Sequence, residues 1–522
     1  MHPAATSSRP DASGALAAHA RLVAAIRDRR PFGHPVLRVE VIETHISTIL
    51  LAGEFAYKLK KPVDLGFVDF TTLDKRERCC QAEVRLNRRT APELYLGVVP
   101  ISGSLDLPVV AGEGEPIEYA VKMRRFAPDA TLDALLRRGA LEPERIDQLA
   151  AVVAQFHRSS PVAAAAGGYG APSLIRQTAL DNFRQIRAHV ADRASLEALA
   201  RLEAWTQAEF DRLGAAFEER QRRGFVRECH GDLHLGNVAL IDDRPVPFDC
   251  IEFSAPLRWI DVMSEAAFTV MDLLAHGERA LAFRFLNGYL EKVGDYEGVA
   301  VLRFYLVYRA LVRAKVAAIQ QRNVDFDLYL QLAETLSRPL APALVLTCGL
   351  SGSGKTTIAR SLAGRLGAVH VRADVERKRL HGIEPMTPAD AAVDAGIYTP
   401  QATAATYERL ARLARSVLAS GFPVIVDATF LRRSQRSAFR DLAAREGARF
   451  VIVRNEAPFA ALHARLAARA QDASDATAAV LERQRASEEG FTPAEAGAVV
   501  VCQTLDRKKC AAALAEVAAR LS

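Results

Sequence analysis

The sequence lacks the features that mark several classes of protein. No uninterrupted apolar run approaches the roughly 18 residues of a membrane-spanning helix, and the first residues, MHPAATSSRPDASG, have no signal-peptide pattern. Cysteine is scarce, with 7 in 522 residues and no C-x-x-C pair, which argues against a disulfide scaffold and a structural zinc site. We expect a cytoplasmic protein with reduced cysteines and no membrane partner.

The sequence also lacks a large excess of either charge sign. Lys and Arg number 68 against 62 for Asp and Glu, a net charge of +6, and half of the residues are hydrophobic. These fractions exclude a disordered chain and are typical of packed globular domains. The small positive excess suits anionic small ligands. With only two tryptophans it gives little support to nucleic acid as a partner.

The clearest motif lies in the C-terminal half. GLSGSGKT matches G-x-x-x-x-G-K-[ST] in full and stands between an apolar strand, ALVLTC, and a helical run. The backbone amides of such a loop bind phosphate, its lysine reaches the β- and γ-phosphates, and its last hydroxyl ligates Mg²⁺. We therefore predict an ATP site with Lys355 catalytic, Thr356 on Mg²⁺, and phosphate bound by Gly349, Ser351, Gly352, Ser353, Gly354, Lys355, Thr356 and Thr357.

Two acidic residues follow further strands of this half. Asp427 closes the apolar strand VIVD and is expected to lie beside Mg²⁺, and no second acid follows it, which disfavours a hydrolytic motor. Asp374 follows the strand HVR at the end where acceptors bind in parallel sheets. It could take a proton from an acceptor hydroxyl while Arg377 binds an anionic group, or it could cap the next helix.

A pair of arginines comes later in this half. Arg465 and Arg469 are four residues apart on one face of a helical run. They are predicted to close over the phosphates of ATP as a lid. The alternative is a solvated basic face.

The motifs GLSGSGKTT, RADVERKRL, VIVDAT and RLAARAQDASDA make this half, about Ala343–Ser522, resemble small P-loop kinases of the gluconate-kinase, zeta-toxin and polynucleotide-kinase type. The resemblance implies transfer of the γ-phosphoryl group of ATP to a hydroxyl. Apolar strands that alternate with helices independently predict an α/β domain with a parallel sheet. The acceptor is left open, because it varies among such kinases.

A second motif for phosphate chemistry lies in the N-terminal half. HGDLHLGN places Asp232 and Asn237 five residues apart, the spacing of a kinase catalytic loop. There the aspartate is the catalytic base that faces the acceptor hydroxyl, and the asparagine reaches Mg²⁺. Twelve residues after Asn237, Asp249 stands at a strand end, where it is also placed to hold Mg²⁺.

This constellation resembles the aminoglycoside phosphotransferase family, whose motif reads H-G-D-x-x-x-x-N followed by an aspartate-bearing strand. The resemblance implies a protein-kinase-like α+β fold with a small mixed lobe and a helical lobe. It implies that Lys58, in FAYK, binds the phosphates of ATP and that Glu83 is its ion-pair partner. Lys60 stays a second candidate for the lysine, and a solvated helix position stays the alternative for Glu83.

One departure from the family matters. The glycine-rich loop between the first two strands is missing, since ETHIST (Glu43–Thr48) stands in its place. The hydroxyls of this segment could still donate to phosphate. The departure weakens the expectation of tight ATP binding in the N-terminal half.

We predict four parts along the chain: a disordered tail at 1–14, a phosphotransferase domain at 15–336 with lobes at about 15–126 and 127–336, a linker at 337–342, and a P-loop kinase domain at 343–522. This arrangement resembles bacterial fusions of the two domain types. The hypothesis is a phosphotransferase with two Mg²⁺·ATP sites, each acting on a hydroxyl of a small molecule. The alternatives are a nucleotide-gated regulatory protein with a P-loop switch and a nucleic-acid end kinase.

Overall fold

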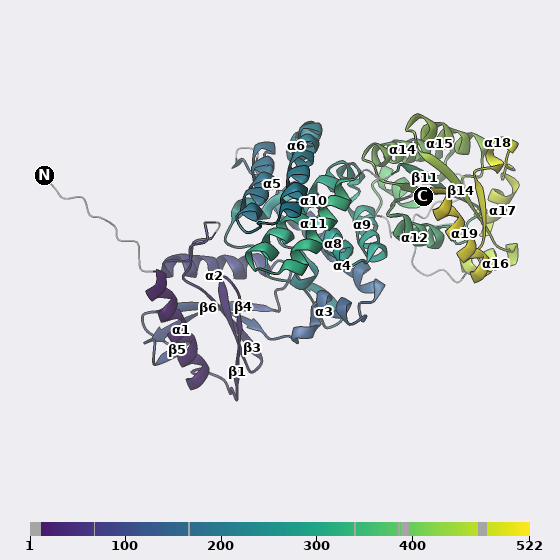
Figure 1. Cartoon of the computed structure of the whole chain (residues 1–522). Helices are drawn as coiled ribbons and strands as arrows, with labels where there is room; N and C mark the ends of the chain where they lie inside the picture. The colour runs from purple at the N-terminus through teal and green to yellow at the C-terminus, as the bar shows by residue number, and fades with distance from the viewer. Residues whose placement is uncertain are drawn as a thin grey trace. The chain divides into compact units, whose positions relative to one another are not determined.

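The computed structural model describes residues 12–66, 68–164, 167–338, 341–384, 387, 396–467 and 478–521. The chain divides into two compact units. The first comprises Met1–Leu141, Ser159–Gly170 and Val226–Glu265, and the second comprises Glu142–Arg158, Ala171–Phe225 and Ala266–Ser522. Figure 1 labels many of their helices and strands. Within the described ranges, no helix has both the length and the apolar character needed to cross a membrane.

The first unit is built on a six-stranded antiparallel sheet with the order β1-β2-β3-β6-β4-β5. The chain turns between β2 and β3 at Gly53, whose φ of 60° suits glycine. The strands are β1 (Val39–Glu43), β2 (Ser47–Ala52), β3 (Phe55–Lys60), β4 (Tyr95–Gly103), β5 (Pro108–Val110) and β6 (Glu118–Arg124).

Two helices cover opposite faces of this sheet, α1 (Ala12–Arg29) and α2 (Leu73–Asn87). Because side chains alternate along a strand, Tyr57 and Leu59 of β3 share a core with α1, while Ala56 shares one with α2. Lys58 and Lys60 have the same parity as Ala56. Both lysines therefore lie on the α2 side of the sheet.

The rest of the first unit carries the HGDLHLGN segment. Strands β7 (Val226–Glu228) and β10 (Trp259–Asp261) pair before and after it, and its end forms the 3-10 turn η3 (Leu235–Asn237). The hairpin of β8 (Val238–Ile241) and β9 (Arg244–Pro247) follows, and its turn residues Asp242 and Asp243 both have positive φ. The other elements are η1 (Pro128–Ala130), α3 (Leu132–Arg137) and α7 (Ala255–Arg258).

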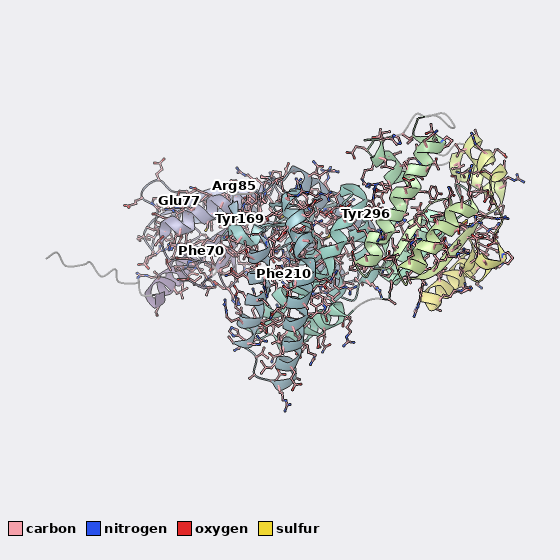
Figure 2. All side chains as sticks on the ribbon, turned by 90° about the horizontal axis from the view of Figure 1, so that it is seen from above. Phe70, Glu77, Arg85, Tyr169, Phe210 and Tyr296 are labelled. Carbon is pink, nitrogen blue, oxygen red and sulfur yellow. The ribbon has the colours of Figure 1, made fainter. Side chains whose placement is uncertain are left out.

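The second unit contains a helical part and a parallel sheet. Helix α10 runs through the helical part, where Phe304 contacts Phe210 and Phe217 at centroid distances of 6.2 and 5.2 Å (Phe210 is labelled in Figure 2). The helices of this part are α4 (Pro143–Ser159), α5 (Pro172–Arg187), α6 (Arg193–Arg222), α8 (Val262–Ala275), α9 (Arg279–Val293), η4 (Tyr296–Gly298), α10 (Val299–Ile319) and α11 (Asn323–Ser337).

The parallel sheet has the order β12-β13-β11-β14-β15. Its strands are β11 (Ala343–Cys348), β12 (Val369–Arg372), β13 (Val424–Asp427), β14 (Arg449–Glu456) and β15 (Val499–Gln503). Helices α12 (Lys355–Leu366) and α19 (Arg507–Leu521) share a core with it. Since all strands run the same way, the segments after β11, β12 and β13 emerge at one edge, where α/β proteins bind ligands.

The remaining helices of the second unit are α13 (Ala373–Leu380), η5 (Gly396–Tyr398), α14 (Pro400–Ala419), α15 (Arg433–Arg445), α16 (Phe459–Ala467), α17 (Ala478–Ala486) and α18 (Pro493–Ala496). The predicted fold class, a kinase-like N-terminal region and an α/β P-loop region, is confirmed. Helix α1 begins at Ala12, inside the predicted tail, and residues 1–11 lie outside the described part.

Candidate active sites

Two lysines of β3 share one glutamate of α2. Lys58 Nζ lies 2.9 Å from Glu83 Oε1, and Lys60 forms an ion pair with the other oxygen of the same carboxylate. Glu83 is completely buried, so the alternative of a solvated position is wrong. Lys60 is also completely buried and pairs with Glu252, whereas Lys58 pairs with Asp249. Lys58 is thus the lysine that meets the carboxylate expected to hold Mg²⁺.

Asp249 is held in an uncommon backbone conformation. Its φ of 64° lies in the left-handed region, which residues other than glycine rarely adopt. The amide of Asp249 donates a 3.1 Å hydrogen bond to the Tyr95 hydroxyl. Burial by itself would raise the pKa of the Asp249 carboxyl, but the charge and hydrogen bond of Lys58 outweigh it and lower the pKa. The result is a charged carboxylate, 42% exposed, at the end of the strand.

Asp232 and Asn237 come together as their spacing predicts. The Asn237 amide donates to the backbone oxygen of Asp232 at 2.9 Å and to its Oδ2 at 3.0 Å. The Asp232 side chain is about one third exposed, so its carboxylate is accessible. The amide of Phe248, the residue before Asp249, donates to the Asn237 carbonyl at 2.9 Å. This contact brings the chain around Asp249 beside the loop of Asp232.

A buried glutamate fixes the start of that loop. Both carboxylate oxygens of Glu265 accept the His230 amide at 2.7 Å, and one accepts the Gly231 amide at 3.2 Å. Gly231 has a φ of 90°, and a Cβ there would lie 2.8 Å from the Leu257 carbonyl oxygen. The loop therefore requires glycine at this position. The His230 ring contacts the Phe248 carbonyl at 2.8 Å, and burial lowers the pKa of the imidazole.

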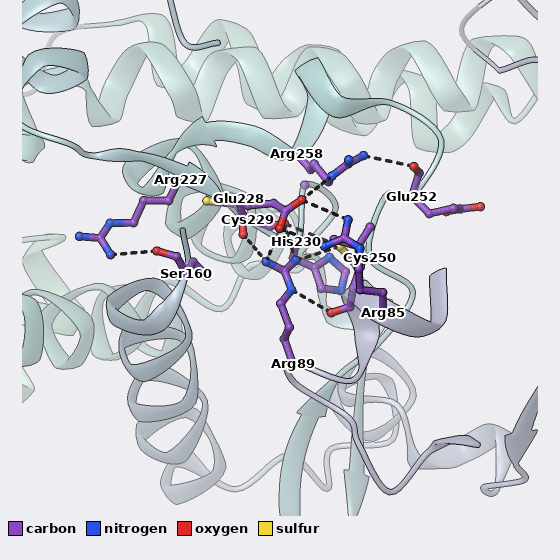
Figure 3. A network of polar contacts seen from close by, with 12 residues as sticks. Arg85, Arg89, Ser160, Arg227, Glu228, Cys229, His230, Cys250, Glu252 and Arg258 are labelled. Atoms are coloured by element: carbon purple, nitrogen blue, oxygen red, sulfur yellow. Dashed lines mark hydrogen bonds and ion pairs between the residues drawn. The ribbon is translucent and has the colours of Figure 1, made fainter. Parts of the chain in front are cut away.

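A second carboxylate ties this loop to helix α2 (Figure 3). Glu228 lies two residues before His230. It pairs with Arg85 of α2, with Arg89 two residues beyond the end of that helix, and with Arg258. Burial would raise the pKa of the Glu228 carboxyl, but the arginines outweigh it and lower the pKa. Because α2 also carries Glu83, one rigid helix positions both the β3 lysines and the loop of Asp232.

The segment in place of the glycine-rich loop is a tight turn. The Thr44 hydroxyl donates to the Ser47 carbonyl at 2.9 Å, and the Thr48 hydroxyl contacts the Glu43 carboxylate and the His19 ring. These two hydroxyls are engaged within the protein. The turn therefore resembles a structural hairpin more than a phosphate-binding loop.

The P-loop of the second unit has the backbone shape that phosphate binding requires. Gly349, Gly352 and Gly354 have φ values of 135°, 81° and 88°. At Gly349 a Cβ would lie only 2.6 Å from the Asn455 carbonyl oxygen. These glycines allow the loop to curl at the N-terminus of α12, where amide groups and the helix dipole favour an anion.

The residues predicted to hold Mg²⁺, Thr356 of the loop and Asp427 of β13, are in direct contact. The Thr356 hydroxyl donates to Asp427 Oδ2 at 2.8 Å, and the Thr347 hydroxyl donates to Oδ1 at 2.9 Å. His370 Nε2 lies 3.3 Å from Asp427 Oδ2. Burial would raise the pKa of the Asp427 carboxyl, but His370 and nearby cations hold it well below its ordinary value. A charged carboxylate beside a hydroxyl is the donor set that Mg²⁺ takes in P-loop proteins.

The P-loop and Asp427 line a cavity of about 1740 Å³. It is lined by the P-loop residues Ser351, Gly352, Gly354, Lys355, Thr356 and Thr357, and also by Asp374, Arg377 and Asp427. Asp374 is the second residue of α13, and the N-cap of that helix is Arg372, so the capping alternative for Asp374 is wrong. Its carboxylate lines the same cavity as Lys355, where a catalytic base is expected.

Two side chains reach over the P-loop. Arg465 Nη1 donates to the Gly352 carbonyl at 3.1 Å and to the Thr504 hydroxyl at 3.2 Å. The Gln484 side chain accepts the Ser351 amide at 2.8 Å. Arg465 therefore lies at the predicted lid position, while Arg469 lies outside the described residues. The Lys355 ammonium donates to the Leu350 carbonyl at 2.9 Å.

Several residues that contact these sites belong to none of the sequence motifs. Tyr95 reaches Asp249 from a strand 154 residues earlier. Glu228 and Glu265 hold the loop of Asp232 in place, but neither residue belongs to a motif. His370 contacts Asp427, and Gln484 contacts the Ser351 amide, from segments far away in the sequence. Only three-dimensional packing brings these groups together.

The fold and the two sets of residues define a chain with a kinase-like site and a P-loop nucleotide site. Family models agree: residues 108–302 match the Phosphotransferase enzyme family and residues 344–490 match the AAA domain. Relatives from Mycobacterium tuberculosis (strain H37Rv) and Mycobacterium bovis, both named as uncharacterized proteins, are 32% identical over 456 residues, covering 86% of this chain and 90% of each relative. The chain belongs to the family of these relatives, and within it a phosphotransferase domain is fused to an AAA domain.

Solved structures resemble parts of the chain. A gluconokinase from Sinorhizobium meliloti 1021 is 24% identical and covers 35% of this chain and 97% of its own, with a TM-score of 0.25. An aminoglycoside 2'-phosphotransferase-IIIa is 13% identical and covers 60% and 97%, with a TM-score of 0.36. The family assignment rests on the family models and the relatives instead of on these likenesses.

Proposed function

We propose that the chain is a Mg²⁺- and ATP-dependent phosphotransferase with two sites, each of which transfers the γ-phosphoryl group to a hydroxyl of a small molecule. The observation that carries the proposal is that each site gathers a lysine, metal-binding groups and an accessible carboxylate from separate elements. Lys58, Asp249 and Asp232 do so in the first unit. Lys355, Asp427 and Asp374 do so in the second.

In the first site Asp232 is the base. Its carboxylate takes the proton of the acceptor hydroxyl while the hydroxyl oxygen bonds to the γ-phosphorus and the bond to the ADP oxygen breaks. Asn237, bonded to Asp232, keeps the carboxylate oriented. Asn237 and Asp249 would hold Mg²⁺, which would neutralise phosphate charge when bound. Lys58 would exchange part of its pairing with Asp249 for the α- and β-phosphates.

In the second site the glycines, Ser351, Ser353 and Thr357 of the P-loop would hold the phosphates, with Lys355 on the β- and γ-oxygens. Ser353 fits this assignment, because its completely buried hydroxyl has no hydrogen-bond partner among the described residues. Thr356 and Asp427 would hold Mg²⁺. Asp374 takes the acceptor proton, and Arg465, with Arg469 as the predicted second arginine, would stabilise charge on the transferring group.

The acceptor of the second site carries negative charge in this proposal. Arg377 lines the cavity, is only 8% exposed, and its Nε has no hydrogen-bond partner among the described residues. Its Nη1 is fixed by the Ile397 carbonyl and the Thr403 hydroxyl. A buried guanidinium with an unsatisfied donor, one turn of helix from Asp374, is suited to a carboxylate or phosphate of the acceptor.

The test follows radiolabel from γ-labelled ATP into a small-molecule extract of cells, with Mg²⁺. The wild-type chain is compared with Asp232→Asn and Lys355→Ala. Two labelled products, each lost in one variant, are the expected result. If either variant formed both labelled products at the wild-type rate, the mutated site would not be one that transfers phosphate.

A second candidate applies to the first unit. The Thr44 and Thr48 hydroxyls are engaged inside the turn that replaces the glycine-rich loop, which favours a unit that recognises nucleotide or a partner without turnover. In that case the P-loop would act alone on phosphate. Saturating ATP binding with no ADP formed by the Lys355→Ala chain over hours would support this candidate.

A further inference from the structure

Strand β12 is the outer strand of the parallel sheet, and it is buried. It pairs only with β13 in the sheet order, and its residue Val369 donates to the Pro423 carbonyl on that side. Because successive residues of a strand direct their N–H and C=O groups to opposite sides, the Ala368 C=O and both backbone groups of His370 face away from the sheet. Ala368 and His370 are at most 4% exposed, so water cannot satisfy these groups.

Side chains of the preceding helical segment take the place of a neighbouring strand. Asn287 of α9 donates from Nδ2 to the Ala368 carbonyl at 3.0 Å and accepts the His370 amide on Oδ1 at 2.8 Å. The hydroxyl of Tyr296, in η4, lies 3.4 Å from the His370 carbonyl and donates to it (Tyr296 is labelled in Figure 2). Thus every outward polar group of this stretch has a partner, and the Asn287 amide pairs with β12 as a peptide group would.

Helix α9 is packed tightly enough to fix this pairing. A Cβ on Gly364 of α12 would lie 3.1 Å from the Ala280 Cα, so the two helices are in close contact. One turn after Asn287, Glu291 pairs with Arg372 at the end of β12 at 2.9 Å. Both Glu291 and Arg372 line the cavity of the P-loop site.

His370 joins this edge to the cation site. Its backbone is held by Asn287 and Tyr296, and its ring nitrogen contacts Asp427 Oδ2, the oxygen that also accepts the Thr356 hydroxyl. A shift of β12 outward would therefore withdraw one of the groups that orient the carboxylate. Partners that orient metal ligands commonly affect metal affinity although they never touch the metal.

We propose that Asn287 is a positioning residue of the P-loop site, which fixes β12 and, through His370, sets the orientation of Asp427 for Mg²⁺. Asn287 lies within the region that matches the Phosphotransferase enzyme family, and its contacts lie within the AAA match. One domain type thus supplies a structural element of the other's active site. This inference rests on the proposed Mg²⁺·ATP site but not on transfer to any acceptor.

The test measures ATP binding to the full chain, with Mg²⁺ and with EDTA, and assigns to the P-loop the component that Lys355→Ala removes. Asn287→Ala is expected to reduce the gain in ATP affinity that Mg²⁺ gives by about threefold to tenfold, and to leave metal-free ATP binding within about twofold. Asn287→Asp keeps the acceptor for His370 but loses the donor, and Tyr296→Phe removes one hydroxyl. Both are expected to give smaller losses and supply the test if the alanine variant does not fold.

Arg303→Ala is the matched control. Arg303, in α10, donates to the Gly421 carbonyl at 2.7 Å and so also joins the helical part to the P-loop region, but it has no contact with β12. It is expected to lower thermal stability without changing the Mg²⁺-dependent gain. The inference is overturned if the folded Asn287 variants keep the wild-type gain, or if they lose metal-free and Mg²⁺-dependent binding equally. Since binding is measured, an absence of phosphoryl transfer would count against the proposed function alone.

Discussion

Lys58 and Asp249 are 191 residues apart in the sequence and form an ion pair at the kinase-like site. Lys60, two residues further along the same strand, is completely buried and pairs instead with the buried Glu252. Both lysines pair with Glu83, but their second carboxylate partners differ. In the proposed function, this difference separates a lysine that would bind the nucleotide, Lys58, from one that stabilises the fold, Lys60.

The Lys58→Ala and Lys60→Ala variants should therefore fail in different ways. Lys60→Ala leaves the buried Glu252 without its cation and is expected to cost about 3–5 kcal/mol of unfolding free energy. Lys58→Ala is expected to cost less, because Glu83 keeps Lys60 and Asp249 is partly exposed, but to abolish the transfer that depends on Asp232. Urea unfolding and label transfer check the two effects. Equal stability losses would contradict the assignment.

The N-terminal helix predicts a pH dependence of stability. Burial, aided by Lys61 and Arg76, lowers the pKa of His19 from 6.5 to about 4 in the folded chain. The unfolded chain therefore binds an extra proton between these values, so this contribution is full above pH 6.5 and is lost as the pH falls toward 4. The shift corresponds to roughly 3 kcal/mol as an upper figure.

Urea unfolding of the wild type and of His19→Gln at pH 7.5 and pH 5 measures this contribution. Glutamine keeps a group able to bond the Thr48 hydroxyl, which His19 contacts at 2.9 Å. The wild type should lose more stability on acidification than the variant. The same loss in both chains would show that His19 is not responsible.

The P-loop predicts a sharp intolerance at one glycine. Gly349→Ala would place a Cβ 2.6 Å from the Asn455 carbonyl oxygen at a φ of 135°, and it is expected to abolish ATP binding at that loop. Gly447→Ala is the control, since Gly447 also has a positive φ, 61°, but open space around it. The control should lose about 1 kcal/mol of stability and keep ATP binding. Equal ATP affinity of the two variants would refute the role of loop shape.

An anionic acceptor makes Arg377 a binding residue of the second site. Arg377→Ala is expected to raise the KM for that acceptor by about tenfold or more while the KM for ATP changes little. Arg365→Ala, at an exposed arginine of the same cavity, serves as the control and should leave both values unchanged. Steady-state kinetics with the acceptor found by label transfer decide. An unchanged KM for the acceptor in Arg377→Ala would show that Arg377 does not bind an anionic group of the acceptor.

Groups close together in the sequence were the most predictable part of the molecule. The P-loop, its strand and its helix are contiguous, and Asp232 and Asn237 are joined by one loop, so spacing alone brings them together. The period of β3 places Lys58 and Lys60 on one face, but it cannot say which of them meets Asp249. The choice between the two lysines depends on where Asp249 and Glu252, which follow β9, lie relative to β3. Only tertiary packing determines this.

Other features were beyond pattern reading for a similar reason. The amide of Asn287 pairs with backbone groups more than 80 residues later, and nothing in its neighbourhood indicates this. Long-range polar contacts of this kind leave no local signature.

The most direct test of two nucleotide sites is the number of ATP molecules bound per chain, measured by equilibrium dialysis with Mg²⁺. The wild type should bind two, Lys58→Ala and Lys355→Ala one each, and the double variant none. A single ATP per wild-type chain, lost entirely in Lys355→Ala, would contradict the proposal of two sites and leave the P-loop as the nucleotide site of the protein.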